Sequence, residues 1–185
     1  MKIGYLGPDG TFSQLAASKL EKSLSNLDVE SISYLSISSL VAAADNGEVD
    51  AAVLPIENSL EGGVNTTLDC LAFECDLTIT KEILIKVRQN LLSKTDMKNI
   101  KKIYSHPQPI GQCSRFLAKN FPDVEIVYTN STAQAAAFAA KDTSSAALGS
   151  EVLADKYSLD ILAEGIEDNP GNTTRFVVAQ KNSLP

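Results

Sequence analysis

The stretch AAVLPIENSLEGGV, residues 51–64, joins a short apolar run to a turn that holds two carboxylates, an amide, a hydroxyl and two adjacent glycines. Residues 51–54 have the composition of a buried strand, and the turn carries more polar side chains than a turn requires. In open α/β sheets, the loop at the carboxyl end of such a strand presents ligand-binding groups. Two interpretations of Asn58 and Ser59 therefore stay open: they cap the next helix, or they contact a ligand.

Strands and helices alternate on both sides of this stretch. Before it, the pattern predicts a strand at residues 2–6, a helix at 12–24, a strand at 29–35 and a helix ending at residue 44. After residue 102 the order begins again, with strands at 103–104, 124–128 and 146–149 and helices at 110–120 and 131–140. We therefore expect an α/β protein of two similar lobes with mostly parallel sheets.

Two long segments are predicted to link the lobes. The β-prone run at residues 77–92 exceeds the usual strand length, and the last strand, residues 175–179, is expected to return to the first lobe. We accordingly predict subdomain 1 at residues 1–80 plus 172–185 and subdomain 2 at residues 81–171. A ligand is expected in the cleft between them, where turns from both lobes converge.

The composition excludes several classes of partner. The 185 residues carry a formal net charge of −7 without a basic cluster, so we expect no nucleic-acid partner. No apolar stretch approaches the roughly 20 residues that span a bilayer, and the first residues lack signal-peptide features, which predicts a cytoplasmic protein without membrane contact. The three cysteines and one histidine do not supply the spaced ligands of a zinc site. We expect free thiols, no metal and no cofactor.

Further polar turns follow the predicted strands. Thr11 opens the first helix, where it either caps the helix or contacts a ligand. In the second lobe, Ser105 and Gln112 can both face a ligand, while His106 is either a helix cap or a functional group. Cys113 near a histidine suggests a thiol nucleophile, but its place in an apolar helix favours core packing.

The last polar segment runs from Asn172 into a strand. Along that strand, alternation predicts Thr174 and Phe176 on one side and Arg175 on the other. Arg175 either binds a carboxylate through both nitrogens or pairs with a surface acid. The strand thus brings a hydroxyl, a guanidinium and a ring to consecutive positions.

Together these segments resemble prephenate dehydratase, which converts prephenate to phenylpyruvate, carbon dioxide and water. The resemblance covers most of the chain and rests on residues 7–13, 55–64, 105–113 and 172–176, in this order. It implies two α/β subdomains similar to the type II periplasmic-binding-protein fold, with the active site in the interlobe cleft. It also implies prephenate as a small-molecule substrate and a homo-oligomer as the assembly.

The resemblance also implies roles for individual residues. Thr174 is implied to be catalytic, the active site is implied to include Asn58, Ser105 and Gln112, and it is implied to be lined by Arg175 and Phe176. The properties of the residues add Thr11 and Ser59 as substrate contacts and, as supporting residues, Glu57, His106 and Asn172. Whether Thr174 transfers a proton or only donates a hydrogen bond stays open.

Two departures and two rival hypotheses accompany the resemblance. Gln14 stands where family members often have a histidine, so we assign no proton transfer there. The chain leaves no room for the regulatory ACT domain common in the family, which predicts either a catalytic fragment or a protein without that control. The rivals are arogenate dehydratase, whose substrate has an amino group in place of a keto oxygen, and a non-catalytic module that binds small anions.

Overall fold

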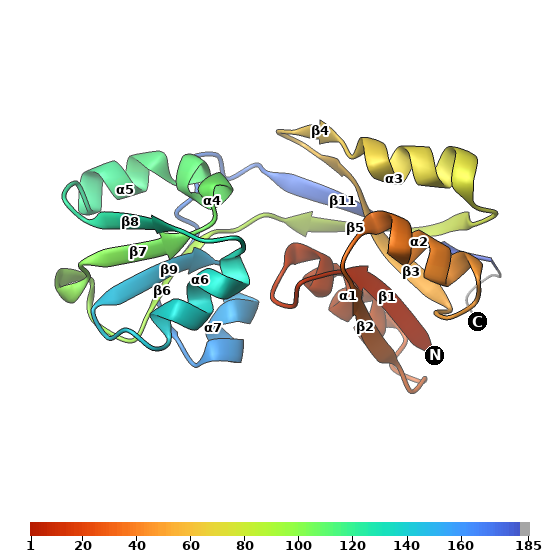
Figure 1. Cartoon of the computed structure of the whole chain (residues 1–185), viewed down its shortest axis with the longest axis horizontal. Helices are drawn as coiled ribbons and strands as arrows, with labels where there is room; N and C mark the ends of the chain where they lie inside the picture. The colour runs from red at the N-terminus through yellow and green to blue at the C-terminus, as the bar shows by residue number, and fades with distance from the viewer. Residues whose placement is uncertain (182–185) are drawn as a thin grey trace. The chain divides into compact units, whose positions relative to one another are not determined.

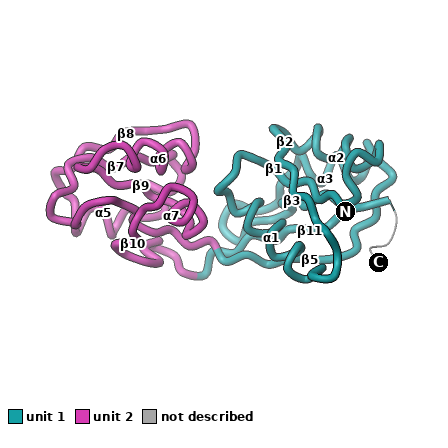
Figure 2. Tube along the Cα trace, turned by 90° about the horizontal axis from the view of Figure 1, so that it is seen from below, with its two compact units in different colours: residues 1–86, 171–185 teal, residues 87–170 magenta. Residues whose placement is uncertain are grey.

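The computed structural model describes residues 1–181, and their contacts divide the chain into two compact units (Figures 1 and 2). Unit 1 comprises residues 1–86 and 171–185, and unit 2 comprises residues 87–170. The boundaries between the units thus lie at residues 86/87 and 170/171, whereas the boundaries predicted from the sequence lie at 80/81 and 171/172. A ligand cleft between the lobes stays a prediction.

Unit 1 is built on a six-stranded sheet with helices on both faces. Its strands are β1 (Lys2–Leu6), β2 (Glu30–Tyr34), β3 (Ala51–Asn58), β4 (Gly62–Gly63), β5 (Thr78–Lys86) and β11 (Thr173–Gln180). Its helices are α1 (Phe12–Ser23), α2 (Ile37–Asp45) and α3 (Asn65–Asp69), the last continuing into a π-helical turn, Cys70–Glu74.

Unit 2 is built on a five-stranded sheet. Its strands are β6 (Asn90–Ser93), β7 (Lys102–Ser105), β8 (Glu125–Tyr128), β9 (Ser145–Gly149) and β10 (Asp160–Ala163). Its helices are α4 (Pro107–Gln112), α5 (Ser114–Asn120), α6 (Thr132–Ala139) and α7 (Glu151–Tyr157), with a 3₁₀ turn at Met97–Asn99.

The two sheets share one topology. The strand order is β2-β1-β3-β11-β5 in unit 1, and the corresponding order in unit 2 is β8-β7-β9-β6-β10. In each sheet the first three strands are parallel, the fourth is antiparallel to the third, and the fifth is antiparallel to the fourth. The prediction of two similar α/β lobes with parallel sheets is therefore confirmed, and the fourth strand adds an antiparallel element to each.

Apolar side chains cover both faces of the unit 1 sheet. On one face, α1 packs Ala16, Ala17 and Leu20 against a cluster that includes Ile3 and Phe176. On the other face, α2 and the α3 region pack against a second cluster that contains Leu54 and Val177. Successive residues of β11 thus enter opposite clusters, as a two-residue period requires.

Two predicted elements are divided in the structure. The run at residues 77–92 forms β5 and β6, one strand in each sheet, so it links the units as expected. The single helix predicted at residues 110–120 is two helices that meet at Cys113, whose φ of −115° and ψ of 19° are not helical. No described helix is long and apolar enough to cross a membrane.

Candidate functional site

The predicted site residues of unit 1 lie at one edge of its sheet. β1 and β3 are parallel neighbours, so the loops that follow them leave from the same edge. β11 runs antiparallel to β3 and therefore begins at that edge. The topology brings Thr11, Asn58, Ser59 and Thr174 to the carboxyl edge of the parallel strands, where α/β sheets bind ligands.

Asn58 and Thr174 form the closest pair among these residues. They face each other across β3 and β11, and Asn58 Nδ2 donates a hydrogen bond of 2.9 Å to Thr174 Oγ1. The Asn58 carboxamide is oriented by its oxygen, which accepts from the backbone N–H groups of Leu60 (3.0 Å) and Glu61 (3.2 Å). The hydroxyl of Thr174 is therefore held as an acceptor, and its own proton donates to no acceptor within residues 1–181.

Ser59 and Asn172 fasten the turn after β3 to the start of β11. The Ser59 N–H donates to the Thr173 carbonyl (2.9 Å), and the Thr173 N–H donates to Ser59 Oγ (2.9 Å). Ser59 Oγ donates to Asn172 Oδ1 at 3.4 Å, and Asn172 is only 2% exposed. These contacts fix the backbone that carries Asn58 and Thr174. In this structure Ser59 and Asn172 therefore support the two neighbouring residues.

Thr11 has the capping geometry that was one of its two interpretations. Its Oγ1 accepts from the Gln14 N–H (3.4 Å) and donates to the Leu6 carbonyl (3.3 Å). Gln14 Oε1 in turn accepts from the Gly10 N–H at 2.6 Å. The polar groups of this turn thus organise the start of α1.

Arg175 pairs with acidic side chains, and Phe176 lies in the core. The Arg175 guanidinium pairs with Glu57 (3.6 Å) and Glu82 (3.1 Å), and all three side chains are about half exposed. Phe176 is 2% exposed and packs in the core beneath α1. We therefore correct the expectation that Phe176 lines a ligand site, because its ring is enclosed by apolar neighbours. Of the two interpretations of Arg175, the structure shows the pairing with acidic side chains.

In unit 2, Ser105 and His106 lie where β7 meets α4. Ser105 is fully buried, and its Oγ donates to the His106 carbonyl (2.9 Å). His106 is the N-cap of α4, with Nδ1 accepting from the Gln108 N–H at 3.3 Å. The capping interpretation of His106 is thus the one that the structure has.

Gln112 has a partner that sequence reasoning missed. Gln89 Nε2 donates to Gln112 Oε1 at 3.1 Å, and the Gln112 carbonyl accepts from the Asp168 N–H at 2.6 Å. The available signal was the pair of uncharged polar residues Gln89-Asn90, which directly precedes the apolar Leu91-Leu92 of β6.

Cys113 is fully buried at the junction of α4 and α5. Burial raises the pKa of its thiol to about 12, and the negative charges of Glu167 and Asp168 contribute. Such a thiol stays protonated near neutral pH, which favours core packing over a nucleophile. Among the described residues, His, Cys, Asp and Glu side chains form no group of three that could hold a metal ion.

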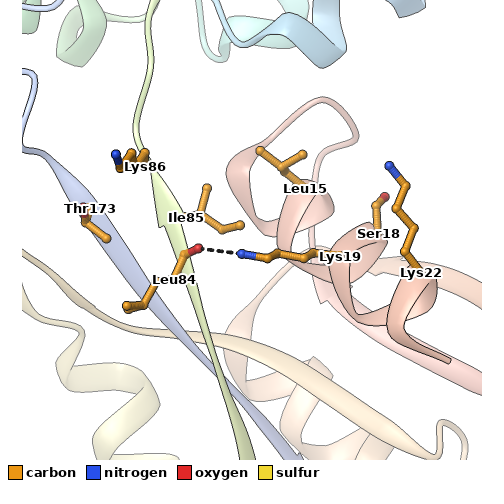
Figure 3. A pocket seen from close by; sticks show the side chains of 8 residues that line it. All are labelled: Leu15, Ser18, Lys19, Lys22, Leu84, Ile85, Lys86 and Thr173. Carbon is orange, nitrogen blue, oxygen red and sulfur yellow. Dashed lines mark hydrogen bonds between the residues drawn. The ribbon is translucent and has the colours of Figure 1, made fainter.

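A hollow of about 520 Å³ opens between α1 and the edge strand β5 in unit 1 (Figure 3). It is lined by Leu15, Ser18, Lys19, Lys22, Leu84, Ile85, Lys86 and Thr173. Lys19 Nζ donates to the Leu84 carbonyl (3.3 Å), and the three ammonium groups point in different directions (Figure 3). They therefore do not form one anion cradle, and no predicted site residue lines the hollow.

The chain is similar to proteins of one family along its whole length. A family model described as prephenate dehydratase matches residues 3–184. The prephenate dehydratase of Bacillus subtilis is 39% identical over 184 residues, which cover 96% of this chain and 63% of that protein. The bifunctional chorismate mutase/prephenate dehydratase of Aquifex aeolicus is 37% identical, with 100% of this chain and 50% of that protein covered. The chain thus spans half to just under two thirds of the length of these relatives.

Solved structures agree with this similarity. The prephenate dehydratase of Arthrobacter aurescens, solved in complex with L-Phe, has a TM-score of 0.85 and 31% identity, covering 100% of this chain and 61% of that chain. A periplasmic substrate-binding protein of an ABC transporter from Coxiella burnetii has a TM-score of 0.52 and 16% identity, covering 98% of this chain and 85% of its own. The second likeness concerns the fold alone, and it agrees with the periplasmic-binding-protein-like architecture expected from the sequence.

Proposed function

Because the chain belongs to the prephenate dehydratase family, we propose that it converts prephenate to phenylpyruvate, with loss of carbon dioxide and water, in phenylalanine biosynthesis. The observation that carries the proposal is the hydrogen bond of 2.9 Å from Asn58 Nδ2 to Thr174 Oγ1. It joins two of the residues that the family resemblance singles out, although 116 positions separate them in the chain.

The direction of this hydrogen bond supports a role for Thr174 as a donor. A hydroxyl has one proton, and the Thr174 oxygen accepts from Asn58, so its proton is available for a substrate oxygen. Donation into the oxygen also polarises the O–H bond, which strengthens the hydroxyl as a donor. We propose that the Thr174 hydroxyl donates a hydrogen bond to the departing ring oxygen of the substrate as negative charge builds there.

The remaining chemistry follows from the substrate. Prephenate carries two carboxylates and a ring hydroxyl, and the loss of carbon dioxide with hydroxide creates an aromatic ring. The thermodynamic driving force therefore comes from the aromatisation of the substrate, and the protein has to orient the dianion and assist the departure of the ring oxygen. We assign Asn58 to the orientation of Thr174, and we keep Ser105 and Gln112 of unit 2 as proposed substrate contacts.

The proposal extends to location and assembly. We propose that the chain acts in the cytoplasm, since its three cysteines are free thiols and such thiols persist in reducing compartments. A homo-oligomer is proposed from the family resemblance, and light scattering of the purified chain tests it.

The test of the activity is incubation of the purified chain with prephenate and, separately, with arogenate. We expect phenylpyruvate to form from prephenate faster than phenylalanine forms from arogenate. Preference for arogenate would assign the chain to the related dehydratase. Binding of prephenate without product would contradict a catalytic role and favour the non-catalytic module.

A further inference from the structure

Gln89 is a buried polar residue whose side chain is only half satisfied. It lies just before β6 and is 3% exposed. Its Nε2 donates to Gln112 Oε1 at 3.1 Å, but its Oε1 is buried and has no hydrogen-bond partner within the described residues. A buried carbonyl oxygen without a donor lowers stability, so a leucine of similar size would suit the site better if packing were its purpose.

The backbones of both glutamines are held by one short segment, Ile166–Asp168. The Gln89 N–H donates to Glu167 Oε2 (2.9 Å), and the Gln89 carbonyl accepts from the Ile166 N–H (2.9 Å). The Asp168 N–H donates to the Gln112 carbonyl at 2.6 Å. The amide–amide hydrogen bond therefore connects two positions that are fixed independently of it.

In this arrangement, one end of the Gln112 carboxamide lacks a partner within residues 1–181. Its oxygen accepts from Gln89, while its Nε2 has no hydrogen-bond partner among residues 1–181. A glutamine without such a partner can rotate and present either its oxygen or its nitrogen. With Gln89 in place, the group left for a ligand is the NH₂ donor.

We propose that Gln89 is a positioning residue, which holds Gln112 so that its amide donates to a substrate oxygen. The assignment of Gln112 to the substrate rests on the proposed function. Prephenate is rich in acceptors, with two carboxylates, a hydroxyl and a keto oxygen, so an NH₂ group suits it better than a carbonyl oxygen. The hydrogen bond acts before substrate arrives, by favouring the orientation in which the Gln112 oxygen faces Gln89.

The first test does not depend on activity. In the folded chain labelled with ¹⁵N-glutamine, the Gln112 side-chain signal is identified by its absence in Gln112→Glu. We expect Gln89→Leu to shift this signal and to make the amide more mobile on the nanosecond timescale. The matched control is Gln180→Leu, because Gln180 is 1% exposed, has both amide atoms unpartnered within residues 1–181 and belongs to the other unit. An unchanged Gln112 signal in Gln89→Leu would overturn the inference.

The second test measures coupling. Gln89→Leu is expected to lower kcat/KM for prephenate by about tenfold, the scale of one misdirected hydrogen bond, with the melting temperature within about 3 °C of the unmodified chain. In a Gln112→Leu background, the same change should have no further effect, whereas Gln180→Leu should leave turnover unchanged. Independent, additive losses would refute a role through Gln112. If the unmodified chain did not turn over prephenate, the proposed function would fail, and the NMR comparison would still decide the role of Gln89.

Discussion

At the residue scale, the Thr174 hydroxyl is held by a short chain of hydrogen bonds. Asn58 is oriented by two backbone N–H groups, and it then fixes Thr174 as an acceptor. The chain of donors ends at the Thr174 hydroxyl, and its proton is left for a further acceptor. This arrangement needs no ionisable group beside the hydroxyl.

Thr174→Ala is therefore expected to lower kcat by about 100-fold or more, since a donor to the leaving oxygen acts mainly in the transition state. Thr174→Ser should retain most of the turnover because it keeps the hydroxyl. Kinetics of phenylpyruvate formation measure both effects, and thermal unfolding checks that the variants are folded. Thr173→Ala is the neighbouring control, because the Thr173 hydroxyl bonds, among the described residues, only to the Gly171 carbonyl, at 3.4 Å. Near-normal turnover in Thr174→Ala would remove the hydroxyl from the mechanism.

Cys113 provides a second residue-level prediction. With its pKa raised to about 12 by burial and by two acidic neighbours, its thiolate is scarce at pH 8, and its alkylation should be roughly 10³-fold slower than that of an ordinary thiol. Half-buried Cys75 should react first with iodoacetamide. Mass spectrometry of the peptides after timed labelling measures this order. Rapid labelling of Cys113 in the folded chain would revive the nucleophile hypothesis.

Among the elements, the break between α4 and α5 shows where local pattern fails. Residues 110–120 have a helical pattern, yet Asp168 lies against the junction. Its carboxylate accepts from the Ser114 hydroxyl (2.7 Å) and the Arg115 N–H (3.1 Å), and so caps a new helix start. A capping group more than 50 residues away cannot be found from helix periodicity.

The packing of α2 on β1 gives a prediction for Gly4. A Cβ at this position would lie 2.4 Å from Leu40 Cδ1 and 3.2 Å from the Tyr34 ring. Since Leu40 is fully buried, Gly4→Ala is expected to cost about 1–3 kcal/mol of unfolding free energy through overpacking. Gly111→Ala in α4 is the control, because nothing lies within 4 Å of its Cβ, and it should be neutral or stabilising by up to about 1 kcal/mol. Urea unfolding compares the two, and an unaffected Gly4→Ala would show that α2 can shift.

At the scale of the whole chain, unit 2 is formed by one segment, whereas unit 1 is formed by two segments that are far apart in the sequence. Unit 2 is one continuous segment, whereas unit 1 needs β11, which pairs between β3 and β5. β11 also contributes Phe176 and Val177 to the clusters on opposite faces of the sheet. The stability of unit 1 therefore depends on residues that follow unit 2 in the chain.

Truncation after Pro170 is accordingly expected to unfold unit 1 and to spare unit 2. The backbone amides of β1, β3 and β5 should lose their protection from hydrogen exchange, whereas those of β7 and β9 should keep it. The matched comparison is residues 87–170 alone, which should show the same protected amides. Retained protection in β3 of the truncated chain would contradict the central role of β11.

Much of this architecture can be predicted from the sequence, because periodicity reports which side chains are buried. The alternation of strands and helices and its repetition in two lobes follow from local pattern and from known rules of sheet connection. The opposite sides of Thr174 and Arg175 on β11 follow from the same two-residue period. These features depend on neighbours along the chain.

Only the tertiary structure identifies the partners that distinguish similar side chains. It pairs Arg175 with Glu57 and Glu82, encloses Phe176 in the core and joins Gln89 to Gln112. Asn58 and Thr174 stand 116 positions apart, and the Asn58 amide that donates between them is itself oriented by backbone N–H groups two and three residues further along its own turn. The physical reason is that periodicity specifies the face on which a side chain lies, whereas its partners are determined by which strands become neighbours and in which register.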